Sequence, residues 1–182
     1  ALTENGAIRA WGTSRTEIFR YGGSGAPSGT GYTSIYSNLL AFAALTNDGS
    51  IDAWGSRIAG GSGAPSDTGY TSIYSTGYAF AALDENGAIR AWGSSLDGGS
   101  GAPSDTGYTS IYSTEYAFAA LAANGSIHAW GESSDGGSGA PSGTGYTSIY
   151  STASAFAALA GDGSIHVWGD SSYGGSGAPT GS

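Results

Sequence analysis

The stretch AFAALDENGAIRAWG, residues 79–93, predicts two antiparallel strands joined by a tight turn. Asn86-Gly87 between two apolar runs is the strongest short hairpin signal, because both residues accept the positive φ of a type I′ turn. Side chains alternate between the two sides of a strand, so Ile89 and Trp92 fall on opposite faces of the returning strand. We therefore expect a β-hairpin that presents one indole.

This hairpin recurs along the chain at a fixed interval of 38 residues. Each copy carries an Asn-Gly or Asp-Gly turn and ends in Trp-Gly, with the indoles at Trp54, Trp92, Trp130 and Trp168. The Ala-Pro pairs keep the same interval, from Pro27 to Pro179, whereas Trp11 departs from it because five extra residues lie in the segment 13–21. Such self-similarity is typical of solenoids, propellers and other arrays, in which each unit buries its apolar face against its neighbours.

A further strand precedes each of the last four hairpins. The segment YTSIYST, residues 70–76, is rich in aromatic and β-branched residues and recurs at 32–37, 108–114 and 146–152. The polar, glycine-rich segment 94–106 is interpreted as a surface connection to the next unit. We predict an all-β chain, one repeat domain over residues 1–182, with five three-stranded units at about 1–31, 32–69, 70–107, 108–145 and 146–182. The first unit is expected to be incomplete.

Two architectures are compatible with this repeat. A β-propeller-like array is favoured, because the hairpins make neighbouring strands antiparallel. The alternative is a β-solenoid, which usually pairs equivalent strands of successive coils in parallel. The many alanines of AFAAL are expected to make room for large side chains from neighbouring layers, which places the tryptophans and the phenylalanine series in the core.

The motif AFAALTNDGSIDAWG, residues 41–55, resembles the repeat of the regulator of chromosome condensation (RCC1) superfamily, and in particular its short bacterial versions. In that pattern a strand of small apolar residues is followed by an Asp-Gly or Asn-Gly hairpin and a strand ending in Trp-Gly. The resemblance covers nearly the whole chain and implies a β-propeller. The nucleotide-exchange activity of eukaryotic members depends on loops that match no segment here, so it is not carried over.

Composition narrows the classes of partner. Fourteen acidic residues against five arginines give a formal net charge of −9, which disfavours nucleic acids and anionic lipids. No apolar run approaches the ~20 residues of a membrane-spanning helix, and no signal peptide is recognisable. The chain contains no cysteine, methionine or lysine. This acidic composition, rich in Ser, Thr and Gly, favours an extracellular or cell-surface location.

No constellation of catalytic, cofactor-binding or metal-binding residues is recognisable. His128 and His166 occupy a repeat position that holds Arg or Asp in other units, so we interpret it as a solvated strand face. The acidic residues of the hairpin turns, among them Asp48 and Asp162, are expected to bond their own backbone. Calcium-loop spacing is absent. We therefore expect no enzyme activity, no cofactor and no metal.

Differences between the repeats collect in two segments, the turn after the first strand and the loop after Trp-Gly. The insertion in the first loop combines arginine with apolar residues typical of interface hot spots, and it is the candidate contact patch: Arg15, Ile18, Phe19, Arg20 and Tyr21. The leading hypothesis is a non-enzymatic extracellular structural or adhesive scaffold that contacts neighbouring chains. Self-association is expected through the unpaired N-terminal strand edge of residues 1–11. The alternative is a lectin-like glycan binder that uses Tyr78, Tyr116 and Tyr173.

Overall fold

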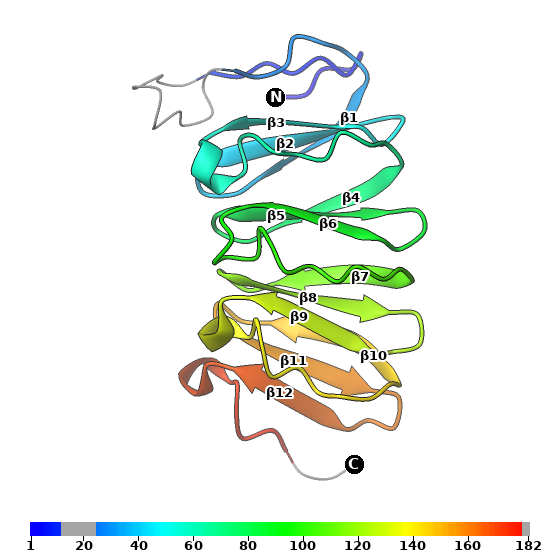
Figure 1. The fold of residues 1–182 in the computed structure, drawn as a ribbon, viewed down its shortest axis with the longest axis vertical. Helices are drawn as coiled ribbons and strands as arrows, with labels where there is room; N and C mark the ends of the chain where they lie inside the picture. Colours follow the sequence, from blue (N-terminus) through cyan, green and yellow to red (C-terminus); the bar gives the residue numbers. More distant parts are fainter. Residues whose placement is uncertain (12–24, 180–182) are drawn as a thin grey trace.

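The computed structural model describes residues 1–11 and 25–179, which form a stack of small antiparallel sheets (Figure 1). Four consecutive units each contain a three-stranded sheet whose strands follow in chain order. The sheets are β1 (Tyr32–Ser37), β2 (Ala41–Thr46) and β3 (Ile51–Gly55); β4 (Tyr70–Ser75), β5 (Ala79–Asp84) and β6 (Ile89–Gly93); β7 (Tyr108–Ser113), β8 (Ala117–Ala122) and β9 (Ile127–Gly131); β10 (Tyr146–Ser151), β11 (Ala155–Ala160) and β12 (Ile165–Gly169). The all-β fold expected from the sequence is confirmed.

Each sheet has the same register. Its first pair of strands is interrupted by an irregularity next to the opening tyrosine, as between Tyr70 and Ser72. In the second pair, Phe80 lies opposite Trp92 and their rings stack at 5.3 Å between centroids. The same Phe-Trp pair recurs in the other three sheets at 5.2 Å. Aromatic pairs of this kind stabilise a hairpin beyond the area they bury.

The four sheets stack in chain order along the long axis of the molecule, and the two ends of the described chain lie at opposite ends of the stack (Figure 1). The array is therefore open. The strand pairing of the named elements runs only within units and is antiparallel throughout. This is the arrangement expected for propeller-like units, and it differs from the parallel pairing between coils that the solenoid alternative requires. The single-domain assignment over 1–182 stays a prediction.

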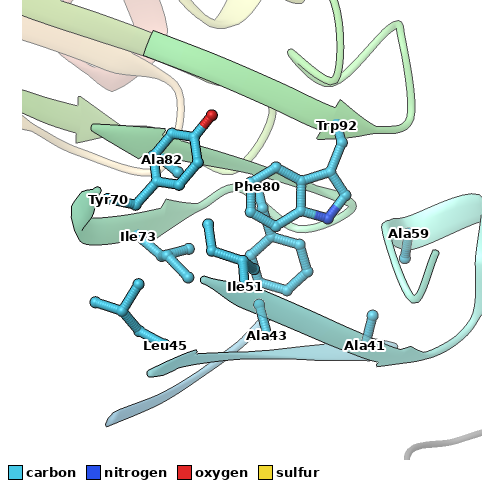
Figure 2. Close-up of a cluster of buried hydrophobic side chains, with 10 residues drawn as sticks. All are labelled: Ala41, Ala43, Leu45, Ile51, Ala59, Tyr70, Ile73, Phe80, Ala82 and Trp92. Atoms are coloured by element: carbon cyan, nitrogen blue, oxygen red, sulfur yellow. The ribbon is translucent and has the colours of Figure 1, made fainter. Parts of the chain in front are cut away.

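The two faces of each of the first three sheets belong to different hydrophobic clusters, as the strand alternation predicts. In the cluster of Figure 2, small and aliphatic side chains of the first sheet, including Ala43 and Ile51, pack against Tyr70, Phe80 and Trp92 of the second. The same small-to-large packing recurs at the next two interfaces. Alanine on one face therefore provides the space for aromatic rings from the next unit.

The loop after each Trp-Gly pair packs more deeply than the sequence predicts. It forms a single 3₁₀ turn in three units, η1 (Arg57–Ala59), η2 (Ser133–Asp135) and η3 (Ser171–Tyr173). The carbonyl of Gly98 accepts a hydrogen bond of 3.0 Å from the indole Nε1 of Trp130 in the next unit, and Gly60 and Gly136 make the equivalent bonds. The expectation of a surface connection is therefore wrong for the glycine that accepts the indole bond, because Gly60, Gly98 and Gly136 are all buried.

The N-terminal segment forms a short hairpin that covers the first sheet. Leu2 and Ile8 are bridged in antiparallel fashion, and Ile8 packs with Tyr32 and Trp54 of the following unit. Trp11 departs from the expected core position. It is 75% exposed, whereas the other four tryptophans are 3–4% exposed, and it borders a pocket of about 260 Å³.

Candidate interaction surface

The two segments that vary between repeats lie along one edge of the stack, which we call the variable edge. It comprises the turns at 38–40, 76–78, 114–116 and 152–154 and the loops at 56–59, 94–97, 132–135 and 170–173. The 3₁₀ turns mark this edge at the left of Figure 1. Side-chain hydrogen bonds join turn to loop within each unit: Asn38 Nδ2 donates to the Ala59 carbonyl at 2.7 Å, and Thr76, Thr114 and Thr152 donate to the carbonyls of Asp97, Asp135 and Tyr173 at 2.9–3.0 Å. The two variable segments thus form one surface.

A backbone hydrogen-bond chain runs along the variable edge from unit to unit. The Leu39 amide donates to the Gly77 carbonyl at 3.2 Å, the Gly77 amide to Glu115 at 2.7 Å, and the Glu115 amide to Ala153 at 2.8 Å. Each unit contributes one residue, so the side chains at neighbouring turns are held in a fixed row. The turns of the variable edge therefore differ in their side chains but share the same backbone hydrogen bonds.

Large apolar side chains and carboxylates are interspersed on this edge. Leu39, Ile58, Leu96 and Tyr173 are 61%, 60%, 72% and 53% exposed. The turn and loop segments of the last three units contribute five carboxylates and no arginine: Asp97, Glu115, Glu132, Asp135 and Asp170. The variable edge therefore presents both apolar and acidic side chains to solvent.

The three candidate glycan-stacking tyrosines are only partly brought together. Tyr78 and Tyr116 stack in parallel at 6.3 Å between centroids with an interplanar angle of 7°. The Tyr116 hydroxyl donates to a Glu115 carboxylate oxygen at 2.8 Å, and this hydrogen bond is the main cause that raises the pKa of Tyr116 to about 12. Tyr173 lies in η3 of the last unit and is not part of this ring stack. All five contact-patch residues lie in the segment 12–24, outside the described residues: Arg15, Ile18, Phe19, Arg20 and Tyr21.

A second recurring polar arrangement involves the tyrosine that opens each sheet. The Tyr70 hydroxyl donates to Asp67 and the Tyr108 hydroxyl to Asp105, both at 3.0 Å. Burial is the main cause that raises the pKa of each of these two phenols to about 12, and the carboxylate contact adds to it. The first and fourth units carry glycine at the position of these aspartates.

In those two units the partner comes from the third strand instead. Tyr32 bonds Asp52, and Tyr146 lies 3.0 Å from the His166 Nδ1. His128 and His166 are both exposed, as the solvated-face interpretation predicts, and His166 in addition contacts the Tyr146 ring edge-on. The opening tyrosine therefore keeps its position in all four sheets, whereas its hydrogen-bond partner comes from the preceding loop in two units and from the third strand in the other two.

The hairpin carboxylates bond their own turns, as predicted. Asp48 Oδ1 accepts from the Ser50 amide at 3.1 Å and Asp162 Oδ1 from the Ser164 amide at 2.9 Å. Hydrogen bonds from neighbouring hydroxyls, Thr46 for Asp48 and Ser164 for Asp162, are the main causes that lower the pKa of these carboxyls. Within residues 1–11 and 25–179, no three His, Asp or Glu side chains converge into a possible metal site. No helix in the same ranges is long and apolar enough to cross a membrane.

Comparisons with known proteins identify the fold. Neither a scan against protein-family profiles nor a search of curated proteins gives a match. Among solved structures, the ectodomain of the Physcomitrella patens receptor kinase CR4 aligns with a TM-score of 0.60 at 21% identity, over 81% of this chain and 41% of that one. The CRINKLY WD40 ectodomain of the Arabidopsis thaliana receptor kinase ACR4 aligns at 0.59 and 17%, over 81% and 52%. Yeast RCC1 (Prp20), crystallised with Kap60, aligns at 0.55 and 16%, over 76% and 43%.

These likenesses confirm the fold that the resemblance to RCC1 repeats implied. The chain has the propeller-type repeat fold of RCC1-like and CRINKLY structures, and it spans about half the length of the chains it matches. Both variable segments were located from the sequence. The row of backbone hydrogen bonds along the variable edge could not be predicted from the sequence, because any residue type can form such bonds.

Proposed function

We propose that this chain is a non-enzymatic extracellular scaffold, structural or adhesive, whose variable edge contacts neighbouring proteins in an assembly. The observation that carries the proposal is that the repeats differ where large apolar side chains are exposed, on a row of turns that the backbone holds rigid. An enzyme concentrates titratable groups in a cleft. Here the side chains of the variable edge are suited to recognition and not to proton transfer.

Charge indicates which proteins fit the variable edge. Leu96 stands one residue before Asp97, and Tyr116 follows Glu115, so apolar contacts lie beside carboxylates. A partner surface with exposed arginine or lysine between apolar side chains would satisfy both, since tyrosine faces and carboxylates attract cations. The structural relatives are consistent with this class of role, because yeast RCC1 was crystallised bound to Kap60.

The proposal is tested by site-specific photo-crosslinking on intact cells that produce the chain. A photoreactive residue at Leu96 is expected to crosslink a partner protein, and Leu39→Asp in the same chain is expected to weaken that crosslink at least severalfold. The matched control places the photoreactive residue at Asn86, an exposed hairpin turn on the opposite edge. Equal crosslinking from both edges, or labelling only after lysis of the cells, would contradict an extracellular variable-edge scaffold.

Glycan binding is the second candidate, and the Tyr78–Tyr116 stack favours it. Aromatic faces held in a fixed row are the usual platform for sugar rings. A glycan array probed with the chain and with Tyr116→Ala separates the two functions. Retention of a glycan that is lost in the variant supports the lectin-like role, and an empty array removes it.

A further inference from the structure

The outward face of the last sheet, which we call the end face, repeats a surface that is covered elsewhere in the molecule. At the three interfaces between sheets, the corresponding small and aliphatic residues pack under aromatic rings of the following unit. In the last sheet, Ile165 is 38% exposed where Ile89 is 4% exposed, and Tyr150 is 62% exposed. The end face is formed by Tyr150, Ala155, Ala157, Leu159, Ile165 and Val167.

Two glycines show how closely a following unit approaches this face elsewhere. A Cβ at Gly136 would lie 2.6 Å from Phe156 of the next unit, and a Cβ at Gly125 would lie 2.5 Å from the backbone of Gly145. At their counterparts in the last unit, Gly174 and Gly163, a Cβ would meet no atom within 4 Å. The end face thus has nearly the same residues as the interfaces between units, but no described residue of another unit packs on it.

The end face contains a hollow of about 120 Å³ where the other units receive an indole. Its walls include Tyr150, Ala157, Tyr173 and Gly174. The carbonyls equivalent to that of Gly174 each accept a tryptophan Nε1–H at 3.0 Å. The Gly174 carbonyl itself accepts no hydrogen bond from the residues described. Size, apolar walls and acceptor therefore fit a tryptophan side chain.

The N-terminal hairpin supplies an indole of the matching kind. Trp11 ends the same Ile-x-Ala-Trp strand motif as Trp54, yet it is 75% exposed. One end of the stack therefore presents an exposed indole, and the other end presents a hollow and a carbonyl acceptor that fit an indole. The two ends differ from each other and are complementary in shape.

We propose that the hollow of the end face binds Trp11 of a second copy of this chain, so that copies join head to tail. This inference deepens the assembly role proposed above by naming one partner and the polarity of the contact. Trp11 inserts between Tyr150 and Tyr173 and donates its Nε1–H to the Gly174 carbonyl. A contact between two different faces propagates into rings or open filaments.

Sedimentation velocity of the chain over a range of concentrations tests the proposal. We expect species larger than a monomer that grow with concentration, and monomers only for Trp11→Ala and for Ala157→Arg. Tyr150→Asp, at a side chain that is already 62% exposed, gives a second end-face variant that preserves folding. His128→Arg is the matched control, because the equivalent position in another unit already holds Arg90, and it is expected to assemble like the parent chain.

Mixing the variants tests the polarity. Trp11→Ala retains the end face and Ala157→Arg retains the indole, so an equimolar mixture is expected to form 1:1 complexes and nothing larger. Two end faces that pair with each other would not be rescued in this way, and that result overturns the proposal, as does a parent chain that stays monomeric near 1 mM. Leu96→Asp on the variable edge is expected to leave self-association unchanged, so failure here and failure of the variable-edge role are distinguishable.

Discussion

Replacing Gly125 by alanine measures how much the contact between successive hairpins contributes to stability. Gly125 has φ of +80°, and its Cβ would lie 2.5–2.7 Å from the backbone of Gly145 and Tyr146. Gly163 is the matched control, because its φ of +87° is nearly the same and its Cβ would meet nothing within 4 Å. The two substitutions share the backbone strain and differ in the contact with the next unit.

The expected cost follows from these two contributions. A left-handed conformation costs a residue with a Cβ about 1–2 kcal/mol, which is the whole effect expected for Gly163→Ala. Gly125→Ala must also displace the following strand, and overpacking against close-packed atoms costs about 1–3 kcal/mol. Displacement weakens the hydrogen bonds from Gly145 to Asn124 and from Tyr146 to Gly125, at 3.2 and 3.1 Å, each worth about 0.5–1.5 kcal/mol. We expect Gly125→Ala to cost about 2–6 kcal/mol more than its control.

Urea unfolding monitored by tryptophan fluorescence gives the free energies, at a protein concentration where each variant is monomeric. Hydrogen exchange of the Gly145 and Tyr146 amides adds a local readout, and both amides are expected to lose protection in Gly125→Ala alone. Costs that agree within about 0.5 kcal/mol for the two variants, with protection intact, would refute the stacking of hairpin on strand.

Three further substitutions test the polar contacts. Trp130→Phe removes the indole donor and leaves the buried Gly98 carbonyl unpaired, so a loss of about 1–3 kcal/mol is expected in the same urea assay. Thr114→Val removes the hydrogen bond that its hydroxyl donates to the Asp135 carbonyl and the one that it accepts from the Ala117 amide, with an expected loss of similar size, about 1–3 kcal/mol. The pKa of Tyr108 is raised from 10.0 to about 12, so the contribution of its neutral form to stability is complete below pH 10 and is lost as the pH rises from about 10 to 12. Asp105→Asn is expected to lower that pKa, measured as phenolate absorbance relative to Tyr108→Phe.

The repeat and its strands could be predicted from the sequence because their signals are local. The Asn-Gly turn, the alternation of Ile89 and Trp92 and the 38-residue interval each depend on a few neighbouring residues. The expected strand at 70–76 is observed at Tyr70–Ser75, and the hairpin expected over 79–93 is observed as the strands Ala79–Asp84 and Ile89–Gly93. Small residues opposite large ones likewise predicted the packing between units.

The contacts that define the candidate surfaces could not be predicted in this way. The indole of Trp130 bonds a carbonyl 32 positions earlier in a glycine-rich loop, and any residue type presents such a carbonyl. The exposure of Trp11 was missed because repeat identity implies the same surroundings, whereas its surroundings depend on what covers the end of the stack. Sequence similarity between units therefore specifies an interface but not whether it is occupied.

The two candidate surfaces follow from one physical property of the stack. Between neighbouring units, the sheet faces are covered and tolerate little change, as the identical YTSIYS strands show. Side chains can vary where no neighbouring sheet packs over them, and the variable edge is such a place because its successive turns are joined by backbone hydrogen bonds and by one stacked pair, Tyr78 and Tyr116. Partner choice can then change along the edge without cost to folding. The end face, in contrast, retains the residues of an internal interface, so its natural partner is another unit of the same kind.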